Sequence, residues 1–248
     1  MIRVAVCGAN GKMGQEVVKA VNSAEDMTLA AQIDVFNGQF TTIKDAKESV
    51  AFDVLVDFTQ PASIYENALY CLNNGIKIVI GTTGLSDLQI EELQKLSEQK
   101  GVACLIAPNF STGAVLMMKF AEMASKYFKN AEIIELHHNQ KKDAPSGTAV
   151  KTAALMQEGA ESFTTGNCTE KETVEGARGA NTYNNIHIHS VRMPGYMASQ
   201  EVLFGSSGQI LTIRHDSTNR ECYMPGVLLG IRYVVNKGGF VYGLDKIM

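Results

Sequence analysis

The chain has 248 residues, of which 45% are hydrophobic and 19% are charged, with a formal net charge of −4. This length allows one large domain or two smaller ones, and the acidic pI near 5.8 argues against a general nucleic-acid binder. No run approaches 18 uncharged apolar residues, so we expect no membrane span.

The five cysteines indicate reduced thiols in a cytoplasmic protein. They are odd in number, widely spaced and form no C-x-x-C pair: Cys7, Cys71, Cys104, Cys168 and Cys222. This pattern fits neither a disulfide framework nor a zinc site. Met1 leads directly into an apolar run without a basic region or a cleavage signal, which also favours the cytoplasm.

The first hundred residues alternate short β-rich runs with amphipathic helices. Strands are predicted at 2–8, 27–34, 53–58, 76–81 and 102–108, and helices at 11–24, from Pro61 to 73–75, and from the Ser86–Asp87 cap to Gly101. Strands that alternate with helices of ten or more residues indicate βαβ units and a parallel sheet.

After Pro108 the pattern changes. The sequence predicts a helix at about 113–128, a strand at 131–138, a helix after Ser146, a long polar loop at 159–185, and strands at 185–193, 199–205 and 209–215. The segment Ser206-Ser207-Gly208 is predicted to form a turn that joins the last two strands into a hairpin. These clustered antiparallel strands predict a second, α+β domain.

A glycine-rich turn lies between the first predicted strand and helix. Gly8, Gly11 and Gly14 are spaced G-x-x-G-x-x-G, close to the dinucleotide fingerprint, in which phosphates sit on the N–H groups of a helix N-terminus. Asp34 ends the next strand and can accept both ribose hydroxyls of an adenosine. The alternative is a tight turn that binds nothing, with Asp34 as a solvated strand end.

Two further strand ends carry candidate cofactor contacts. The segments GTTGL (81–85) and APNFS (107–111) each close a predicted parallel strand. Residues at the carboxyl ends of such strands face the ligand crevice, so both segments could meet a nicotinamide ring. Each could equally be an ordinary βα loop.

The segment ELHHNQKKDAPSGTA (135–149) contains two of the five histidines, His137 and His138, side by side. Adjacent residues on a strand point to opposite faces, and no carboxylate or cysteine lies at a standard ligand spacing. We therefore predict no metal site. A core role for His138 remains open at this stage.

The run after the histidines suits an anionic substrate. Ser146 and Thr148 place two hydroxyls at a predicted helix start, where free N–H groups make a carboxylate site. Lys141 adds a positive charge, and histidine or lysine can supply a proton near neutral pH. The alternative is that Lys141 and Lys142 belong to a solvated loop.

Taken together, these motifs resemble a known family. The turn ending in GKMG, then DFTQP (57–61), GTTG (81–84), APNFSTG (107–113), the histidine–lysine segment and HDSTNR (215–220) occur in the order seen in 4-hydroxy-tetrahydrodipicolinate reductases, also called dihydrodipicolinate reductases. The resemblance covers essentially the whole chain.

The resemblance implies a Rossmann dinucleotide-binding domain at 1–108 and 216–248. It implies a substrate-binding domain at 109–215 that also builds a homotetramer. The implied chemistry is hydride transfer from NADH or NADPH to a small dicarboxylate, forming tetrahydrodipicolinate and water in diaminopimelate and lysine biosynthesis.

The resemblance also implies roles for individual residues. His137 matches the proton donor or acceptor and Lys141 the proton donor, without deciding which delivers the decisive proton. His138, Gly147 and Thr148 match the residues that hold the substrate carboxylates. The hydroxyl of Ser146 at the predicted helix start, described above, is a further candidate for the same role. The implied cofactor contacts are Gly8, Ala9, Asn10, Gly11, Lys12, Met13, Asp34, Gly81, Thr82, Thr83, Ala107, Pro108, Asn109 and Phe110.

Two departures from the family pattern matter. Members that favour NADPH often carry arginine after the acidic residue and within D-F-T-x-P, where a guanidinium can bind a 2′-phosphate. This chain has Val35 and Gln60, so we predict that NADH is used at least as well as NADPH. The segment 192–209 also departs from the better-known version, and no role is assigned to it.

Two other functions remain compatible with parts of the sequence. Another two-domain Rossmann dehydrogenase, acting on an amino or keto acid, would predict the glycine turn but not HHNQKKDAPSGTA. A non-catalytic dinucleotide sensor would need the turn and Asp34, but would gain nothing from Lys141.

Overall fold

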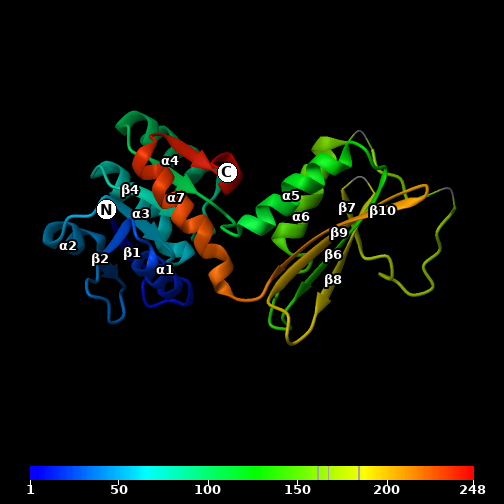
Figure 1. Ribbon diagram of the computed structural model, residues 1–248, viewed down its shortest axis with the longest axis horizontal. Coiled ribbons are helices and arrows are strands. Elements are labelled where there is room, and N and C mark those ends of the chain that lie inside the picture. The colour runs from blue at the N-terminus through cyan, green and yellow to red at the C-terminus, as the bar shows by residue number, and fades with distance from the viewer. Residues whose placement is uncertain (161, 167, 184) are drawn as a thin grey trace. The chain divides into compact units, whose positions relative to one another are not determined.

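The computed structural model describes residues 1–160, 162–166, 168–183 and 185–248. The chain divides into two compact units (Figure 1). The first contains Met1–Thr112 and Arg220–Met248, and the second contains Gly113–Asn219.

The first unit is built on a six-stranded, wholly parallel sheet in the order β11-β5-β4-β3-β1-β2. Its strands are β1 (Ile2–Cys7), β2 (Met27–Ile33), β3 (Val54–Asp57), β4 (Lys77–Ile80), β5 (Cys104–Ile106) and β11 (Phe240–Tyr242). The chain passes from β1 to β2 on one side and then to β3 on the other. This reversal is the switch point where doubly wound sheets bind ligands.

Helices cover both faces of this sheet. They are α1 (Lys12–Ser23), α2 (Ile43–Ser49), α3 (Pro61–Asn73), α4 (Asp87–Lys100) and α7 (Met224–Asn236), with short 3-10 turns at Arg220–Tyr223 and Leu244–Lys246. The predicted ends of α4 are confirmed, because Ser86 forms a capping box with Gln89 and Gly101 ends the helix in the left-handed conformation. The sequence prediction missed α2, α7 and β11.

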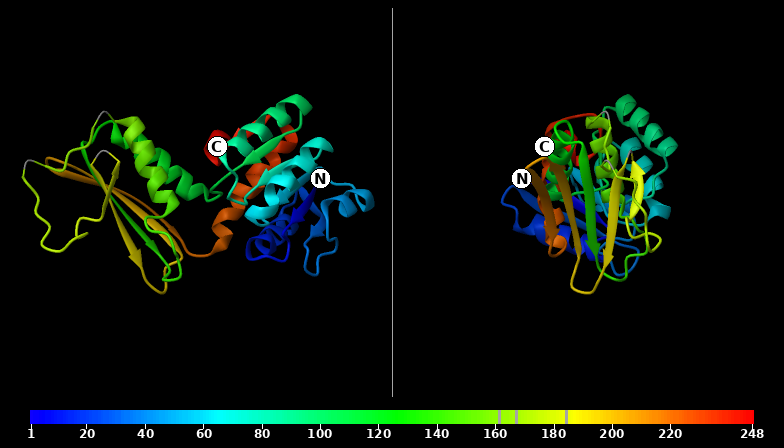
Figure 2. Two further views of the ribbon diagram at one scale, coloured as in Figure 1. Left: turned by 180° about the vertical axis from the view of Figure 1, so that it is seen from behind. Right: turned by 90° about the vertical axis from the view of Figure 1, so that its right-hand side faces the viewer.

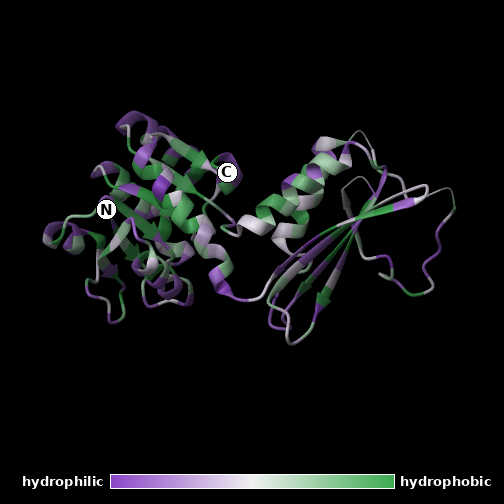
Figure 3. Cartoon of the chain, in the orientation of Figure 1, coloured by the Kyte–Doolittle hydropathy of each residue, from purple (hydrophilic) through white to green (hydrophobic). Residues whose placement is uncertain are grey.

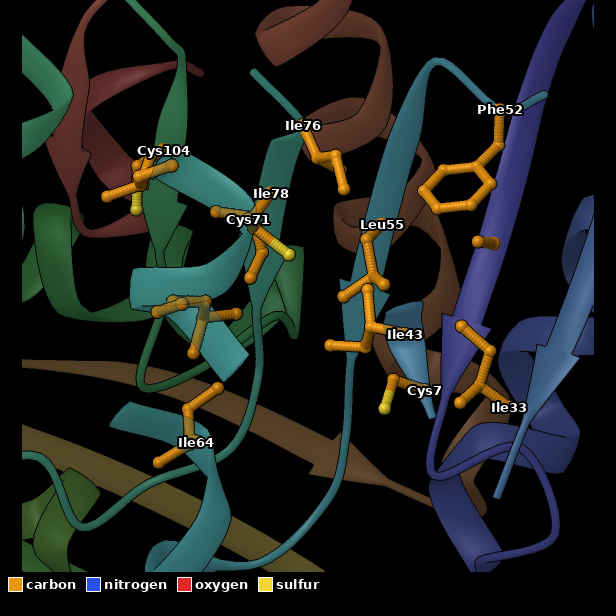
Figure 4. Close-up of a cluster of buried hydrophobic side chains, with 14 of the residues drawn as sticks. Cys7, Ile33, Ile43, Phe52, Leu55, Ile64, Cys71, Ile76, Ile78 and Cys104 are labelled. Carbon is orange, nitrogen blue, oxygen red and sulfur yellow. The ribbon is translucent and has the colours of Figure 1, made fainter. Parts of the chain in front are cut away.

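One part of the core of the first unit lies between the sheet and the helices α2, α3 and α4. Leu55 and Ile78 from the strands are fully buried against Ile64 and Cys71 from α3 (Figure 4). Hydrophobic residues follow the strands, whereas much of α4 is hydrophilic (Figure 3). This pattern is typical of a sheet buried on both faces.

The second unit has a five-stranded mixed sheet in the order β10-β9-β6-β8-β7. Its strands are β6 (Asn130–His137), β7 (Ala180–Tyr183), β8 (Ile186–Arg192), β9 (Ala198–Ser206) and β10 (Gln209–Ser217). The pair β6–β8 is parallel and the other pairs are antiparallel. The strand β7 lies within the segment 159–185, which was predicted as a loop, so that prediction is wrong there.

Two helices, α5 (Thr112–Ser125) and α6 (Gly147–Gly159), pack on one face of this sheet (Figures 1 and 2). Along β6, Ala131, Ile133 and Glu135 are buried on that face, while the residues between them are partly exposed. This alternation is the period of a half-covered strand. The predicted fold class, a Rossmann-type α/β unit with a second α+β unit, is confirmed.

Candidate active site

Glycines allow the tight turn between β1 and α1. Gly8 has a φ of 79°, in the left-handed region that favours glycine. A Cβ at Gly14 would lie 2.0 Å from the carbonyl oxygen of Gly8, so α1 can approach the turn only without a side chain there. Because α1 begins at Lys12, the N–H groups of Lys12 and Met13 have no acceptor within the helix. Unpaired N–H groups at the positive end of a helix dipole are suited to an anion.

Asp34 is held beside this turn. Its carboxylate accepts hydrogen bonds from the backbone N–H groups of Asn10 at 3.0 Å and Phe36 at 2.9 Å. The side-chain amide of Asn10 also donates to the carbonyl oxygen of Phe36 at 2.6 Å. Each carboxylate oxygen retains a lone pair for a further donor such as a ribose hydroxyl.

A buried carboxylate, Asp57, joins the ends of β3 and β4. It accepts hydrogen bonds from the N–H and hydroxyl groups of Thr59 at 2.9 and 2.7 Å, and from the hydroxyl of Thr82 at 2.8 Å. The side-chain amide of Asn67 donates to its second oxygen at 2.9 Å. All of these donors are neutral. The hydroxyl of Thr82, a predicted cofactor contact, therefore points into the protein.

Two cavities lie at the carboxyl edge of the first sheet. One, of about 170 Å³, is lined by Met13, Phe58, Gly81, Ala107, Pro108, Asn109, Phe110 and Tyr223. The other, of about 110 Å³, is lined by Thr82, Thr83, Gly84, Leu85, Ile90, Ile106, Pro108 and Tyr242. The fold thus brings together predicted cofactor contacts from the glycine turn, the end of β4 and the end of β5. Phe58, Tyr223 and Tyr242 were not predicted.

In the second unit, Glu135 is the centre of a buried hydrogen-bond group at the end of β6. Its carboxylate lies 2.5 Å from Nδ1 of His137. The guanidinium of Arg192 donates to both carboxylate oxygens, at 2.8 and 2.7 Å. The N–H of Ser146 donates to the same carboxylate at 3.2 Å. This group ties β6 and β8 to the start of α6.

Glu135 is ionised throughout the neutral pH range. Burial alone would raise its pKa, but hydrogen bonds from His137, Arg192 and Ser190 outweigh that effect and lower the pKa to about 2. The carboxylate in turn raises the pKa of Arg192. The result is a bidentate ion pair between Glu135 and Arg192 at the buried edge of the sheet.

Contacts continue from this group to Lys141. Arg192 donates to the backbone carbonyl of Asp143 at 2.8 Å. The ammonium of Lys141 lies 2.7 and 2.9 Å from the carboxylate oxygens of Asp143, whose pKa it lowers. The backbone N–H of Lys141 donates to the carbonyl of His138. Lys141 is thus paired within the loop, whereas Lys142, the other residue of the solvated-loop alternative, is exposed.

The N-terminus of α6 lies in the same loop. Ser146 is buried, and its hydroxyl accepts a hydrogen bond from the N–H of Ala149, as expected for an N-cap. Gly147 and Thr148 follow it as the first helical residues, so their N–H groups have no acceptor within the helix. His138 is exposed, and its Nδ1 accepts a hydrogen bond from the N–H of Gln140, so it is not a buried core residue.

Sequence reasoning missed Glu135 and Arg192. The available signal for Glu135 was the alternation along β6. Ala131, Ile133 and Glu135 fall on the same buried face, so a carboxylate stands where a hydrophobic residue is expected. Arg192 opens the segment to which no role was assigned, and no local pattern pairs it with a residue 57 positions earlier.

Within the described residues, no group of three or more histidine, cysteine, aspartate or glutamate side chains is arranged to hold a metal ion. In the same part of the chain, no helix combines the length and apolar character needed to cross a membrane.

The first unit has the doubly wound sheet typical of dinucleotide-binding proteins, and the second carries a histidine, a lysine and a helix N-terminus. This combination is the one expected of a two-unit pyridine-nucleotide oxidoreductase. The family model "Dihydrodipicolinate reductase, N-terminus" matches residues 2–110, and "Dihydrodipicolinate reductase, C-terminus" matches residues 113–248. The chain belongs to the dihydrodipicolinate reductase family, and the resemblance found in the sequence is confirmed.

Relatives match over the full length. The 4-hydroxy-tetrahydrodipicolinate reductase of Streptococcus thermophilus is 50% identical over 254 residues, covering 100% of this chain and 99% of the relative. That of Gloeothece citriformis is 48% identical over 269 residues, covering 100% and 98%.

Solved structures are similar to the chain at two levels, family and fold. The dipicolinate-bound dihydrodipicolinate reductase from Paenisporosarcina sp. TG-14 is 46% identical, with a TM-score of 0.93 and 100% of both chains covered. A myo-inositol dehydrogenase from Corynebacterium glutamicum is 13% identical with a TM-score of 0.61, covering 97% of this chain and 90% of that one. The second likeness concerns the fold alone.

Proposed function

We propose that the chain reduces 4-hydroxy-tetrahydrodipicolinate to tetrahydrodipicolinate, with release of water, in diaminopimelate and lysine biosynthesis. Family membership supports the reaction. The observation that carries it at the residue level is the loop 137–148, which combines His137, Lys141 and the N-terminus of α6 within one unit. When bound, the reduced nicotinamide nucleotide supplies the hydride.

The first unit supplies the groups that we assign to the cofactor. The N–H groups of Lys12 and Met13 would bind the pyrophosphate, and Asp34 the adenosine ribose. The cavity lined by Met13, Gly81 and Phe110 is suited to a flat, largely apolar ring. Because Val35 and Phe36 are exposed and carry no charge, we assign NADH as at least equal to NADPH.

The second unit supplies the groups that we assign to the substrate. The N–H groups of Gly147 and Thr148, with His138, would hold carboxylates of a small anionic dicarboxylate. Lys141 and His137 would exchange protons with the substrate. The dipicolinate bound to the Paenisporosarcina relative is a dicarboxylate, which supports this choice of ligand. Asp143 is exposed, so a substrate carboxylate can replace it beside Lys141.

We also assign this chain to a homotetramer in the cytoplasm. The face of the second sheet opposite α5 and α6 carries the partly exposed Ile134 and Leu136 and the exposed Ile210. These apolar side chains suit a surface on which the sheets of two chains pair. The free state of all five cysteines supports the location. Light scattering should give the mass of four chains, and a monomer would contradict the assignment.

The decisive experiment follows NADH absorbance while the pure protein acts on substrate generated by the preceding synthase. Turnover that requires this substrate supports the proposal. Turnover with amino or keto acids instead would indicate another dehydrogenase. NADH binding without any turnover would indicate a nucleotide sensor.

A further inference from the structure

The pleat of β6 fixes which residues accompany His137. Glu135 and His137 are two positions apart on one strand, so their side chains emerge on the same face. Arg192 is the register partner of His137 on the parallel strand β8, and it shares that face. Strand geometry therefore places a carboxylate, an imidazole and a guanidinium together under the start of α6.

The contact between Glu135 and His137 has a defined direction. An ionised carboxylate can only accept hydrogen bonds, so Nδ1 of His137 must carry the proton in their 2.5 Å contact. In the neutral imidazole, Nε2 is then the unprotonated nitrogen. In the imidazolium both nitrogens carry a proton, and the proton on Nε2 is the one that is not hydrogen-bonded to Glu135. The side chain of His137 is 15% exposed, so the ring is held rather than freely rotating.

Arg192 is needed to maintain that direction. A buried carboxyl group without a counter-charge tends to become protonated, and its O–H could then donate to Nδ1. The opposite tautomer would follow, with the proton on Nε2. The bidentate ion pair keeps Glu135 ionised, and the N–H of Ser146 adds a further donor.

The other charged groups of this loop act at longer range. Lys141 is paired with Asp143, and His138 is bonded to the backbone of Gln140. In the described part of the chain, Glu135 is the carboxylate that contacts the ring of His137.

The same sheet contains a chemically matched group in a different environment. Glu132, on the opposite face of β6, contacts Nε2 of His189 at 2.8 Å and the guanidinium of Arg178 at 2.6 Å. The side chain of Glu132 is 35% exposed, whereas that of Glu135 is fully buried. This second group is an internal control, because it has the same three residue types outside the proposed site.

We infer that Glu135 is a positioning residue for His137: it holds the imidazole by Nδ1, so that Nε2 is the nitrogen that exchanges a proton with the substrate, and Arg192 keeps the carboxylate in the accepting state. The inference rests on the proposed function for the role of His137 in the reaction. The state of the imidazole itself can be measured without any turnover.

The first test is ¹⁵N NMR of the imidazole nitrogens in the intact protein, with His137 assigned by comparison with His137→Asn. At a pH where the ring is neutral, we expect proton-bearing Nδ1 and unprotonated Nε2 in the wild type. Glu135→Gln should shift the population toward Nε2–H, because the amide can donate to Nδ1 as well as accept from it. Wild-type protein with the proton on Nε2 overturns the inference, even if the variant fails to fold.

The second test measures turnover of NADH with the synthase-generated substrate. Glu135→Gln should lower kcat by about 10- to 100-fold with little change in KM, less than the loss of a general acid itself. Glu132→Gln should stay within about twofold of the wild type, since its partner His189 lies outside the site. Normal kcat in Glu135→Gln together with a large loss in His137→Ala would overturn the positioning role.

The variants of His137 and Glu135 separate a failure of the proposed function from a failure of the positioning role. If His137→Ala retains normal kcat, the proposed catalytic role of His137 is wrong, whatever the tautomer. If His137→Ala is inactive but the tautomer is the same in wild type and Glu135→Gln, only the positioning role of Glu135 is wrong.

Discussion

Each unit buries one carboxylate near the carboxyl end of an inner strand of its sheet. The two carboxylates have different hydrogen-bond partners. Asp57 in the first unit accepts hydrogen bonds from hydroxyl, amide and backbone groups, all neutral. Glu135 in the second unit is paired with the guanidinium of Arg192 and the imidazole of His137. In the described residues these are the carboxylates that are buried.

The difference matches what the two edges are proposed to do. The neutral group around Asp57 fixes the loops after β3 and β4, where a cofactor would meet mainly backbone and small side chains. The charged group around Glu135 fixes a side chain whose proton must be in a defined place. Neutral donors are enough to hold the loops that would bind a cofactor. A fixed charge is needed in the second unit to keep the carboxylate ionised and thus to hold the proton of His137 on Nδ1.

The largest expected effect concerns the charged edge. Lys141→Ala should lower kcat by about 10²–10⁴-fold, because it removes the group proposed to donate a proton as the hydride arrives. NADH affinity should be unchanged. The adjacent Lys142→Ala is the control and should have little effect. A near-normal kcat for Lys141→Ala would contradict the assigned role, and a rise in KM alone would assign Lys141 to carboxylate binding instead.

The next largest effect is a loss of stability, which should differ between the buried Glu135 and the partly exposed Glu132. Glu135→Gln leaves Arg192 without its counter-charge and should lower the free energy of unfolding at pH 7 by about 3–5 kcal/mol. The partly exposed Glu132→Gln should cost no more than about 1 kcal/mol, because solvent screens its pairs. Urea unfolding of both variants beside the wild type measures the difference.

This stability difference should depend on pH with a definite sign. The pKa of Glu135 is lowered in the folded state from 4.5 to about 2, so the ionised form is favoured by folding. Its contribution is complete above pH 4.5 and is lost as the pH falls toward 2. The gap between wild type and Glu135→Gln should therefore shrink from pH 5 to pH 2. A gap that stayed constant would show that the ion pair is not its source.

A smaller effect is expected at the start of α6. Thr148→Val keeps the shape and the backbone N–H but removes a hydroxyl that is proposed to bind a charged carboxylate, worth about 1.5–3 kcal/mol. The loss should appear mainly as a raised KM, with kcat and NADH affinity little changed. A fall in kcat without a change in KM would exclude simple carboxylate binding.

The smallest effect concerns the choice between NADH and NADPH in the first unit. The carboxylate of Asp34 repels a 2′-phosphate, and the exposed Val35 offers no compensating charge, so NADPH should not be preferred to NADH. Val35→Arg should shift the ratio of kcat/KM values toward NADPH. A wild-type preference for NADPH above about tenfold, roughly 1.4 kcal/mol, would contradict the assignment.

The sequence by itself determined the features that depend on local geometry. Glycine spacing, strand–helix alternation and the cap at Ser86 predicted the parallel sheet and its turns, because backbone conformation and hydrophobic period are set by neighbouring residues. The ordered motifs indicated the family. Ser146 was correctly placed at a helix start for the same local reason.

Only the tertiary structure decided how distant charges are paired. Arg192 reaches Glu135 because β6 and β8 lie side by side in parallel register, and that register depends on packing across the sheet. The resemblance implied that the C-terminal segment returns to the first unit, but the helix α7 and the strand β11 that complete this unit were not predicted. A buried ion pair is stable only where both partners are brought together and shielded from water, and no local pattern records that condition.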